Sequence, residues 1–345
     1  MSHTTLVGQG QYHIASDYLI LLTDIGFEQG ITAADLLANT GLSESILFQP
    51  GVLVGHLSAI RFVDNFCQRC NNLTMAMEYG KRMTLSKHGA LGFAAQYSAT
   101  MTEAALKVMR YVETRAQLFR LERRHSDSHA QLLIHPRFDT NSPAGPFLSL
   151  AFLSSVETIC RTLVGQQGRH AQSVIHIQAT LANLSEQTVL PHCHIIDSAS
   201  DNSLSWPLTA LAHSLPFFDP NMAHLAEQQL ENSLRELQQQ RTMTEHVTVL
   251  LEQHLTHALT LEDVAQRLCT SSATLNRKLK QEHTTFQQLK DQVRFQQAKQ
   301  LLQQGRLSQE QIADALGYSD ASNFAKAFKS WAGCSPAQYR QQHKP

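Results

Sequence analysis

The sequence predicts an α+β N-terminal domain followed by an all-α domain with two helix-turn-helix units joined by a long helix. Three observations support this prediction. Two segments near the C-terminus, 260–282 and 308–331, share one layout of helix, short turn and helix. The first two thirds of the chain instead mixes helical periodicity with the alternation that is typical of strands. A chain of 345 residues is long enough for two domains of ordinary size.

Charge is divided unevenly between the two predicted domains. Residues 241–345 contain 13 Lys and Arg against 9 Asp and Glu, a net charge of +4. Residues 1–240 contain 15 and 20, a net charge of −5, so the whole chain carries only −1. This distribution is expected if only the C-terminal part meets phosphate groups.

The composition is typical of a folded globular protein, with 42% hydrophobic and 17% charged residues. The longest uninterrupted apolar runs, such as 18–22 and 147–153, are too short to span a bilayer. The first residues lack the charged and apolar regions of a secretory signal. Six scattered cysteines are sparse for a disulfide scaffold. We therefore expect a cytoplasmic protein with no membrane partner.

The N-terminal two thirds alternates between two kinds of apolar spacing. Helical spacing predicts helices within 16–48, 60–66, 75–83, 102–114 and 147–164. Thr102 is a possible N-cap, and the last of these helices is apolar enough to be buried. Strands are predicted at 116–124, 130–134 and 173–179, with one or two more within 193–206.

Three prolines between 207 and 220 mark the end of the first domain. Asp219 or Asn221 could cap a helix that runs to about Gln240, which is either a linker with a possible dimer contact or a plain surface helix. The predicted divisions are a flexible N-terminus at 1–15, the α+β domain at 16–215, the linker helix at 216–240 and the all-α domain at 241–345.

Each C-terminal unit carries its own start signal. Thr260 and Ser308 stand as N-caps, with Asp263 and Gln311 three residues later at the capping-box position.

The interior of each unit requires small residues. Ala265 and Ala313 allow two helices to cross closely, and Gly317 tolerates the positive φ of a tight turn. Residues 286–303 read as one long helix between the units.

The second helix of each unit has two distinct faces. Helical spacing makes one face buried, comprising Leu275 and Leu279 in the first helix and Phe324, Phe328 and Trp331 in the second. The opposite faces hold Ala273, Asn276, Arg277, Lys280, Ala321, Ser322, Asn323 and Lys326. Asn can read adenine, and Arg or Lys favours guanine or phosphate, so these faces predict contact with double-stranded DNA. Each side chain could instead meet phosphate or solvent.

Residues 312–340 closely resemble the signature of AraC-family transcription regulators. The matching positions are Ile312, Ala313, Gly317, Tyr318, Phe324, Phe328, Gly333, Ser335, Pro336, Tyr339 and Arg340. The resemblance covers about 240–343 and implies two helices that enter successive major grooves about 34 Å apart. It implies base-facing positions at Ala273, Asn276, Arg277, Ser322, Asn323 and Lys326. Members often carry Arg where Lys326 stands, which puts a bidentate guanine contact there in doubt.

Residues 16 to about 210 resemble the regulatory domain of one AraC subgroup, in motifs at 89–94, 102–105, 110–111 and 201–208. The resemblance implies a small-molecule effector, which could be an amino acid, a fatty acid or a sugar, together with RNA polymerase and a homodimeric partner. The candidate effector-binding residues are Arg61, Arg110, Tyr111, Arg115 and Arg120. These side chains could equally lie on the surface or in ion pairs.

Two cysteine motifs suggest alternative functions. Cys67 and Cys70 have the CxxC spacing of redox or metal sites, but no second pair accompanies them. Cys193 lies in a sequence that partly resembles the acceptor site of AraC-linked DNA-repair methyltransferases, although an extra His interrupts the order. The sequence shows no P-loop, dinucleotide fingerprint or zinc-ligand cluster. We expect no catalytic residues, cofactor or metal, and a protein that is not an enzyme.

Overall fold

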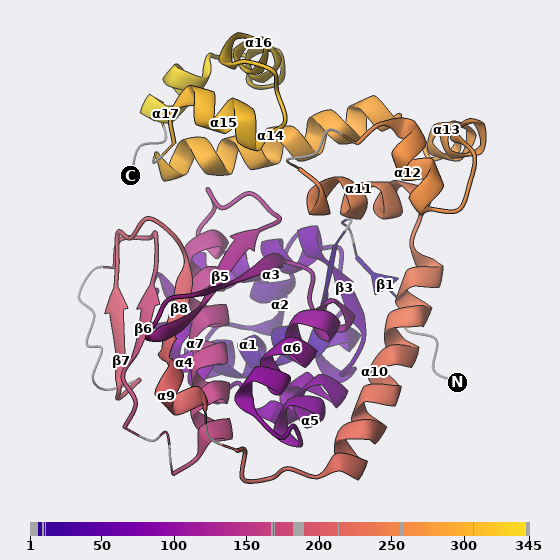
Figure 1. Ribbon diagram of the computed structural model, residues 1–345. Coiled ribbons are helices and arrows are strands. Elements are labelled where there is room, and N and C mark those ends of the chain that lie inside the picture. The colour runs from indigo at the N-terminus through magenta and orange to yellow at the C-terminus, as the bar shows by residue number, and fades with distance from the viewer. Residues whose placement is uncertain are drawn as a thin grey trace. The chain divides into compact units, whose positions relative to one another are not determined.

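The computed structural model describes residues 6–8, 10, 12–166, 168, 170–181, 190–212, 214–255, 259–305 and 307–342. The chain divides into two compact units, residues 1–236 and 237–345 (Figure 1). The α+β character of the first unit and the all-helical character of the second are as predicted.

The first unit begins with a small sheet where a flexible N-terminus was expected. Strand β3 (Leu53–Gly55) pairs in parallel with β1 (Leu6–Val7) and antiparallel with β2 (His13–Ala15). Ile14 and Ala15 are buried, so part of the predicted flexible segment 1–15 belongs to the core. Residues 1–5, 9 and 11 of that segment lie outside the described residues.

Helices form the bulk of the first unit. They are α1 (Ser16–Glu28), α2 (Ala33–Leu37), α3 (His56–Cys70), α4 (Met75–Arg82), α5 (Ala90–Gln96), α6 (Met101–Tyr111), α7 (Ala144–Val164), α9 (Leu208–Leu211) and α10 (Pro220–Gln240). Short 3₁₀ helices occupy Glu44–Phe48, Leu85–His88 and Val112–Thr114. The cap of α6 is Thr100 rather than the expected Thr102, because the Glu103 N–H donates to the Thr100 hydroxyl.

Helices α4 and α7 approach each other closely because one contact residue is glycine. A Cβ atom built on Gly80 would lie 2.3 Å from the Cβ of Ser154, a separation that no side chain can adopt. Helix α7 is also, among the described residues, the one helix long and apolar enough to cross a membrane by length and composition. It carries buried Glu157, which accepts hydrogen bonds from Arg161 and Ser173, and 56% of its most apolar window is buried in the unit. Helix α7 is therefore packed as a core helix.

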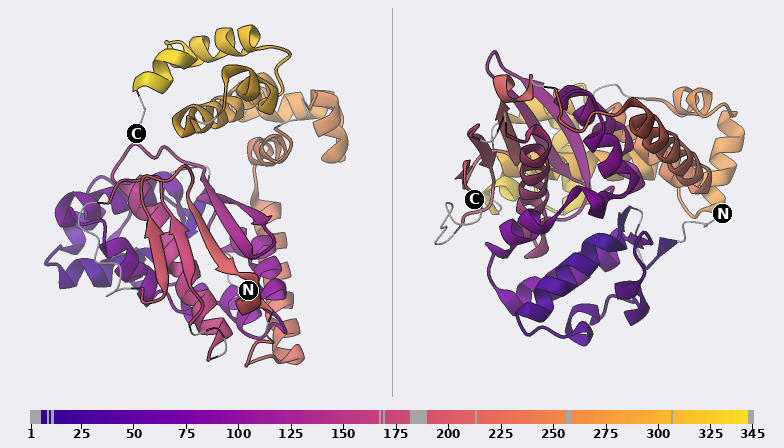
Figure 2. Two further views of the ribbon diagram at one scale, coloured as in Figure 1. Left: turned by 60° about the vertical axis from the view of Figure 1, so that its left-hand side comes forward. Right: turned by 90° about the horizontal axis from the view of Figure 1, so that it is seen from below.

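A five-stranded sheet completes the first unit (Figure 2). Its strand order is β4-β5-β8-β6-β7. Its strands are β4 (Phe119–His125), β5 (His129–Pro136), β6 (Ser173–His176), β7 (Cys193–Ile196) and β8 (Ser203–Pro207). Only β6 and β7 pair in parallel among the described strands of this sheet. The β4–β5 hairpin forms around the predicted polar turn, where the His129 N–H donates to the Ser126 hydroxyl.

Helix α10 covers the position of the predicted linker. Asp219 caps it by accepting from the Asn221 and Met222 N–H groups, and Pro220 takes the first helical position. Ala226 and Leu230 of α10 form a buried cluster with residues of α5 and α6. The boundary between the units falls inside this helix, after Glu236, so most of 216–240 packs with the first unit.

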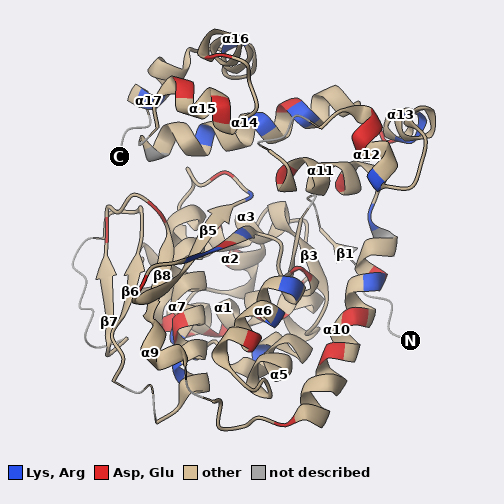
Figure 3. Ribbon diagram, viewed as in Figure 1, with Lys and Arg blue, Asp and Glu red and all other residues tan. Residues whose placement is uncertain are grey.

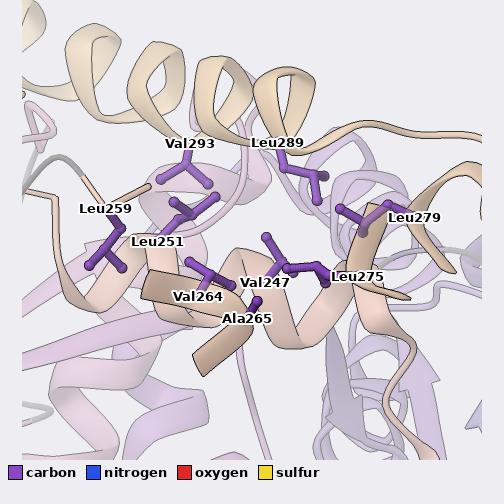
Figure 4. Packing of buried hydrophobic residues seen from close by; sticks show 9 residues of the cluster. All are labelled: Val247, Leu251, Leu259, Val264, Ala265, Leu275, Leu279, Leu289 and Val293. Atoms are coloured by element: carbon purple, nitrogen blue, oxygen red, sulfur yellow. The ribbon is translucent and has the colours of Figure 1, made fainter. Parts of the chain in front are cut away.

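The regular elements among the described residues of the second unit are helices. They are α11 (Met243–Gln253), α12 (Leu261–Arg267), α13 (Ser272–Gln281), α14 (Phe286–Gln304), α15 (Gln309–Ala315), α16 (Ala321–Ala332) and α17 (Pro336–Gln342). Two hydrophobic clusters form its core. Figure 4 shows the first, in which Leu289 and Val293 of α14 meet side chains of α11, α12 and α13. Ala298 and Leu302 of the same helix belong to the second cluster, so α14 is shared by both cores.

Candidate DNA-binding surface and ligand cavity

The two helix-turn-helix units repeat at an interval of 48 residues. Both capping boxes are formed as predicted: Thr260 with Asp263, and Ser308 with Gln311. In each box the cap hydroxyl accepts from the later N–H at 3.2 Å, and the later side chain accepts from the cap N–H at 2.8 Å. The start of each first helix is thus fixed by its own side chains.

The turns that follow are also equivalent. Each first helix ends in a left-handed residue, Cys269 with φ 51° in the first unit and Gly317 with φ 70° in the second. The next N–H then donates back to an alanine carbonyl at 2.9 Å, Thr270 to Ala265 and Tyr318 to Ala313. Both alanines are buried, as the close helix crossing requires.

The second helices of the two units repeat at an interval one residue longer than the first helices do. Ser271 caps α13 and Asp320 caps α16, an interval of 49 residues, because the second turn is one residue longer. The buried pairs Leu275–Leu279 and Phe324–Phe328 follow the same interval, and all four side chains are fully buried. Arg277 is therefore equivalent to Lys326, and Lys280 to Lys329.

The predicted DNA-facing side chains lie on the outer faces of these helices. All eight face away from the core: Ala273, Asn276, Arg277, Lys280, Ser322, Asn323 and Lys326 are exposed, and Ala321 is half-buried. Sequence reasoning missed Lys329, which is also exposed. Its position directly after the buried Phe328, like that of Lys280 after Leu279, was the available signal.

Asn323 is already engaged in the unbound protein. Its amide nitrogen donates to the Ser319 hydroxyl at 2.9 Å and to the Asp320 carboxylate at 2.7 Å. Both amide hydrogens are thus occupied, and the side-chain oxygen has no hydrogen-bond partner among the described residues. A two-point contact to adenine at this position requires Asn323 to exchange one of these bonds.

Helix α14 contacts both helix-turn-helix units through its own basic residues. The Lys290 ammonium donates to the Leu259 carbonyl at 3.0 Å, at the entrance to the first unit. The Arg294 guanidinium donates to the Gly317 carbonyl at 3.2 Å and lies 4.6 Å from the centre of the Tyr318 ring. Figure 3 shows Lys and Arg residues along α14 and on α13. One continuous helix therefore contacts both helix-turn-helix units.

The first unit encloses a cavity of about 460 Å³. One side is formed by α6 and α7, with contributions from α5, and the other by the β4, β5 and β8 strands. Its walls are mainly apolar, and include Met101, Val108, Phe152, Leu204 and Trp206. This size lies within the range of about 300–1,000 Å³ that is usual for small-molecule sites.

The polar groups of the cavity wall are few. Tyr18 and His88 are linked by a hydrogen bond of 2.8 Å between the hydroxyl and Nδ1. Burial raises the pKa of Tyr18 to about 12 and lowers the pKa of His88 to about 4, so both side chains are neutral at pH 7. The buried His88 Nε2 and Trp206 Nε1 atoms have no hydrogen-bond partner among the described residues. Both atoms belong to residues of the cavity wall.

None of the five predicted effector-binding residues lines this cavity. Arg61 is exposed, and Arg120 lies 3.9 Å from the carboxylate of Glu122. Arg115 pairs with Asp17 at 2.8 Å and lies over the Tyr18 ring, behind the cavity wall.

The remaining two hold helix α10 in place. Arg110 pairs with Glu231 of α10 at 2.5 Å, and the buried Tyr111 hydroxyl donates to Glu231 at 2.6 Å. Burial and this carboxylate raise the pKa of Tyr111 well above its usual range. These side chains were selected by residue type, and the structure gives the last four of them charged partners within the protein.

Burial disfavours the thiolate form of the three cysteines in the two motifs. Burial raises the pKa of Cys67 and of Cys193 to about 12 and also raises the pKa of Cys70, which opposes thiolate formation. Cys70 is the last residue of α3. No group of three or more His, Cys, Asp or Glu side chains that could hold a metal is found among the described residues.

Two family models match this chain. The model for a helix-turn-helix domain matches residues 264–342, which contain both recognition helices. The model for the arabinose-binding domain of AraC transcription regulators matches residues 30–214, more than half of the chain.

The chain belongs to the AraC family of transcription regulators. It is an AraC-type DNA-binding regulator with an N-terminal effector-binding domain.

Relatives match this AraC-type chain along most of its length. The ornithine utilization regulator of Pseudomonas aeruginosa is 28% identical over 89% of this chain and 93% of its own. An uncharacterized HTH-type transcriptional regulator of Mycobacterium tuberculosis is 24% identical over 93% of this chain and 94% of its own. The crystal structure of the transcriptional regulator CdpR from Pseudomonas aeruginosa covers 94% of this chain and 98% of its own at 20% identity, with a TM-score of 0.47.

Proposed function

We propose that this AraC-type regulator reads its operator through the exposed faces of α13 and α16, under the control of a small molecule bound in the cavity of the first unit. The observation that carries the proposal is the repeated geometry of the two helix-turn-helix units. Two capped first helices and two second helices, α13 and α16, each with a basic outer face, are joined by the single helix α14. This construction suits two successive major grooves on one side of a duplex.

Base reading is carried by a small number of side chains. Arg277 and Asn276 of α13 are long, exposed and without hydrogen-bond partners among the described residues, so they can reach base edges. Ala273 and Ala321 can offer only methyl contacts, and Lys280, Lys326 and Lys329 suit phosphate or guanine. Part of the sequence preference is then expected to come from DNA shape.

The chemistry of the cavity favours an effector with a large apolar part over a free sugar or amino acid. A free sugar or amino acid needs many polar partners, whereas this wall is mainly apolar. Ornithine, named in the relative from Pseudomonas aeruginosa, carries two ammonium groups. No Asp or Glu stands among the described residues that line the cavity to pair with them. An effector with a large apolar part is the better match.

An exposed apolar surface supports a homodimer. Phe217, Phe218, Met222 and Leu225 lie at the start of α10 and are each at least 40% exposed. Large side chains exposed together are typical of protein interfaces. Leu225→Glu should convert a dimer to a monomer in sedimentation velocity, and a wild-type monomer would contradict this part. We further propose that the protein acts in the cytoplasm with RNA polymerase, and that neither domain is an enzyme.

The test of the function is selection of binding sites from a random DNA pool, followed by titration of the enriched site. Arg277→Ala should weaken binding to that site by about 1–3 kcal/mol and relax the preference at one position. Arg235→Ala removes an exposed arginine from α10 and should leave binding unchanged. Failure to enrich any sequence at moderate salt would refute the proposal.

A further inference from the structure

We propose that the effector is an amphipathic monoanion, such as a medium-chain carboxylate, whose chain fills the cavity and whose head group pairs with Arg123. This inference rests on the proposed function, because it assigns a ligand class to the same regulatory cavity. It arises from the distribution of charge over the two faces of one strand.

Strand β4 separates its charged residues by the alternation of its side chains. Phe119, Leu121, Arg123 and His125 occupy alternate positions, and all four line the cavity. Arg123 is thus placed on the cavity face of the sheet, in register with Leu132 of β5.

The carboxylate of β4 lies on the other face. Glu122 accepts from Arg124 at 2.7 Å and contacts His135 at 2.9 Å and Arg120 at 3.9 Å. None of these four side chains lines the cavity. Glu122 therefore interacts with basic residues on the face away from the cavity. Arg123 has no acidic partner among the described residues.

Arg123 is also unusual among the residues of the cavity wall. It is exposed, and it is the one Lys or Arg among the described lining residues, which include no Asp or Glu. An apolar cavity with a single unpaired guanidinium at an exposed position complements a molecule with one anionic end and an apolar body. The guanidinium forms paired hydrogen bonds with a carboxylate, whereas an alcohol or an ammonium gains no such pair.

The experiment uses the full-length protein and three probes of equal chain length: decanoate, decanol and decylammonium, each below its micelle concentration. Calorimetric titration should show decanoate binding at least tenfold more tightly than decanol, with no measurable binding of decylammonium. Affinity should rise about fourfold for each added methylene from hexanoate upward, until the cavity is filled.

Two matched variants locate the head group. Arg123→Gln should abolish the preference for decanoate over decanol, while Arg124→Gln, one residue along on the other face, should retain it. Equal binding of decanoate and decanol by the wild type, or an unchanged preference in Arg123→Gln, would overturn the inference. So would the absence of binding by carboxylates of six to fourteen carbons. Operator titration of the same preparations separates the two proposals: intact DNA recognition without carboxylate binding contradicts the ligand class alone.

Discussion

The left-handed residue in each helix-turn-helix turn gives a quantitative test of the structural repeat. Cys269 and Gly317 occupy equivalent positions with φ values of 51° and 70°. An L-residue in this conformation is strained by about 1–2 kcal/mol, while glycine increases the entropy of the unfolded chain by about 0.5–1 kcal/mol. The Cys269 side chain is exposed, so its removal loses little burial. Cys269→Gly should therefore stabilise the second unit by about 0.5–1 kcal/mol, and Gly317→Ala should destabilise it by a similar amount.

Urea unfolding monitored by tryptophan fluorescence measures these changes. The chain has two tryptophans, Trp206 in the first unit and Trp331 in the second, so a Trp206→Phe background reports on the second unit. Cys269→Ala is the matched control, because it removes the thiol but keeps the backbone strain, and its stability should equal that of the wild type. If Cys269→Gly is no more stable than Cys269→Ala, the two turns do not share the left-handed geometry.

Two further substitutions each test one contact, the first in the second unit and the other in the first unit. The Glu282 carboxylate accepts hydrogen bonds from the Met243 and Thr244 N–H groups at 2.9 and 2.7 Å. Burial of the carboxylate raises its pKa, but these hydrogen bonds outweigh that effect and hold the pKa below the usual 4.5. The pKa of Glu282 is lower in the folded state than in the unfolded state. The wild type should therefore have a higher free energy of unfolding than Glu282→Gln in urea at pH 7, and this difference should decline as the pH falls below about 4.5. A difference that does not depend on pH would contradict this. Gly80→Ala forces a Cβ atom to within 2.3 Å of Ser154 and should destabilise the first unit by about 1–3 kcal/mol in thermal unfolding. An unchanged melting temperature would contradict the close approach of α4 and α7.

The local features of the second unit were predictable because their signals lie within a few residues of each other. A capping box spans four residues, and the buried and exposed faces of α13 and α16 follow from helical spacing alone. The one-residue shift between the two recognition helices was harder to recognise. Each turn is short. Only alignment of the buried pairs Leu275–Leu279 and Phe324–Phe328 shows that Lys329 occupies the position equivalent to Lys280.

The ligand cavity could not be predicted from sequence in the same way. Its wall combines residues of β4, α6, α7 and β8, which are separated by up to about a hundred positions. Selection by residue type found arginines such as Arg110 and Arg115, which form ion pairs with Glu231 and Asp17. Alternation along β4 could have indicated that Arg123 shares a face with Leu121, but not that a cavity lies on that face.

The N-terminal strands and α10 were missed or assigned differently for a related reason. β1 is two residues long and pairs with β3 47 positions later, so no local pattern identifies it. The packing face of α10 rests on small and apolar residues such as Ala226 and Leu230, whose partners lie on α5 and α6. A helix of this composition is indistinguishable in sequence from an exposed linker.

The central claim is that α13 and α16 both contact DNA, on one face of the duplex. Hydroxyl-radical footprinting of the full-length protein on its selected site tests it most directly. Each protomer should protect two patches separated by about 10 base pairs, one helical turn. Arg277→Ala should weaken the patch made by α13 and leave the other, and Lys326→Ala should do the reverse. A single protected patch per protomer, or loss of both patches together in either variant, would contradict the account.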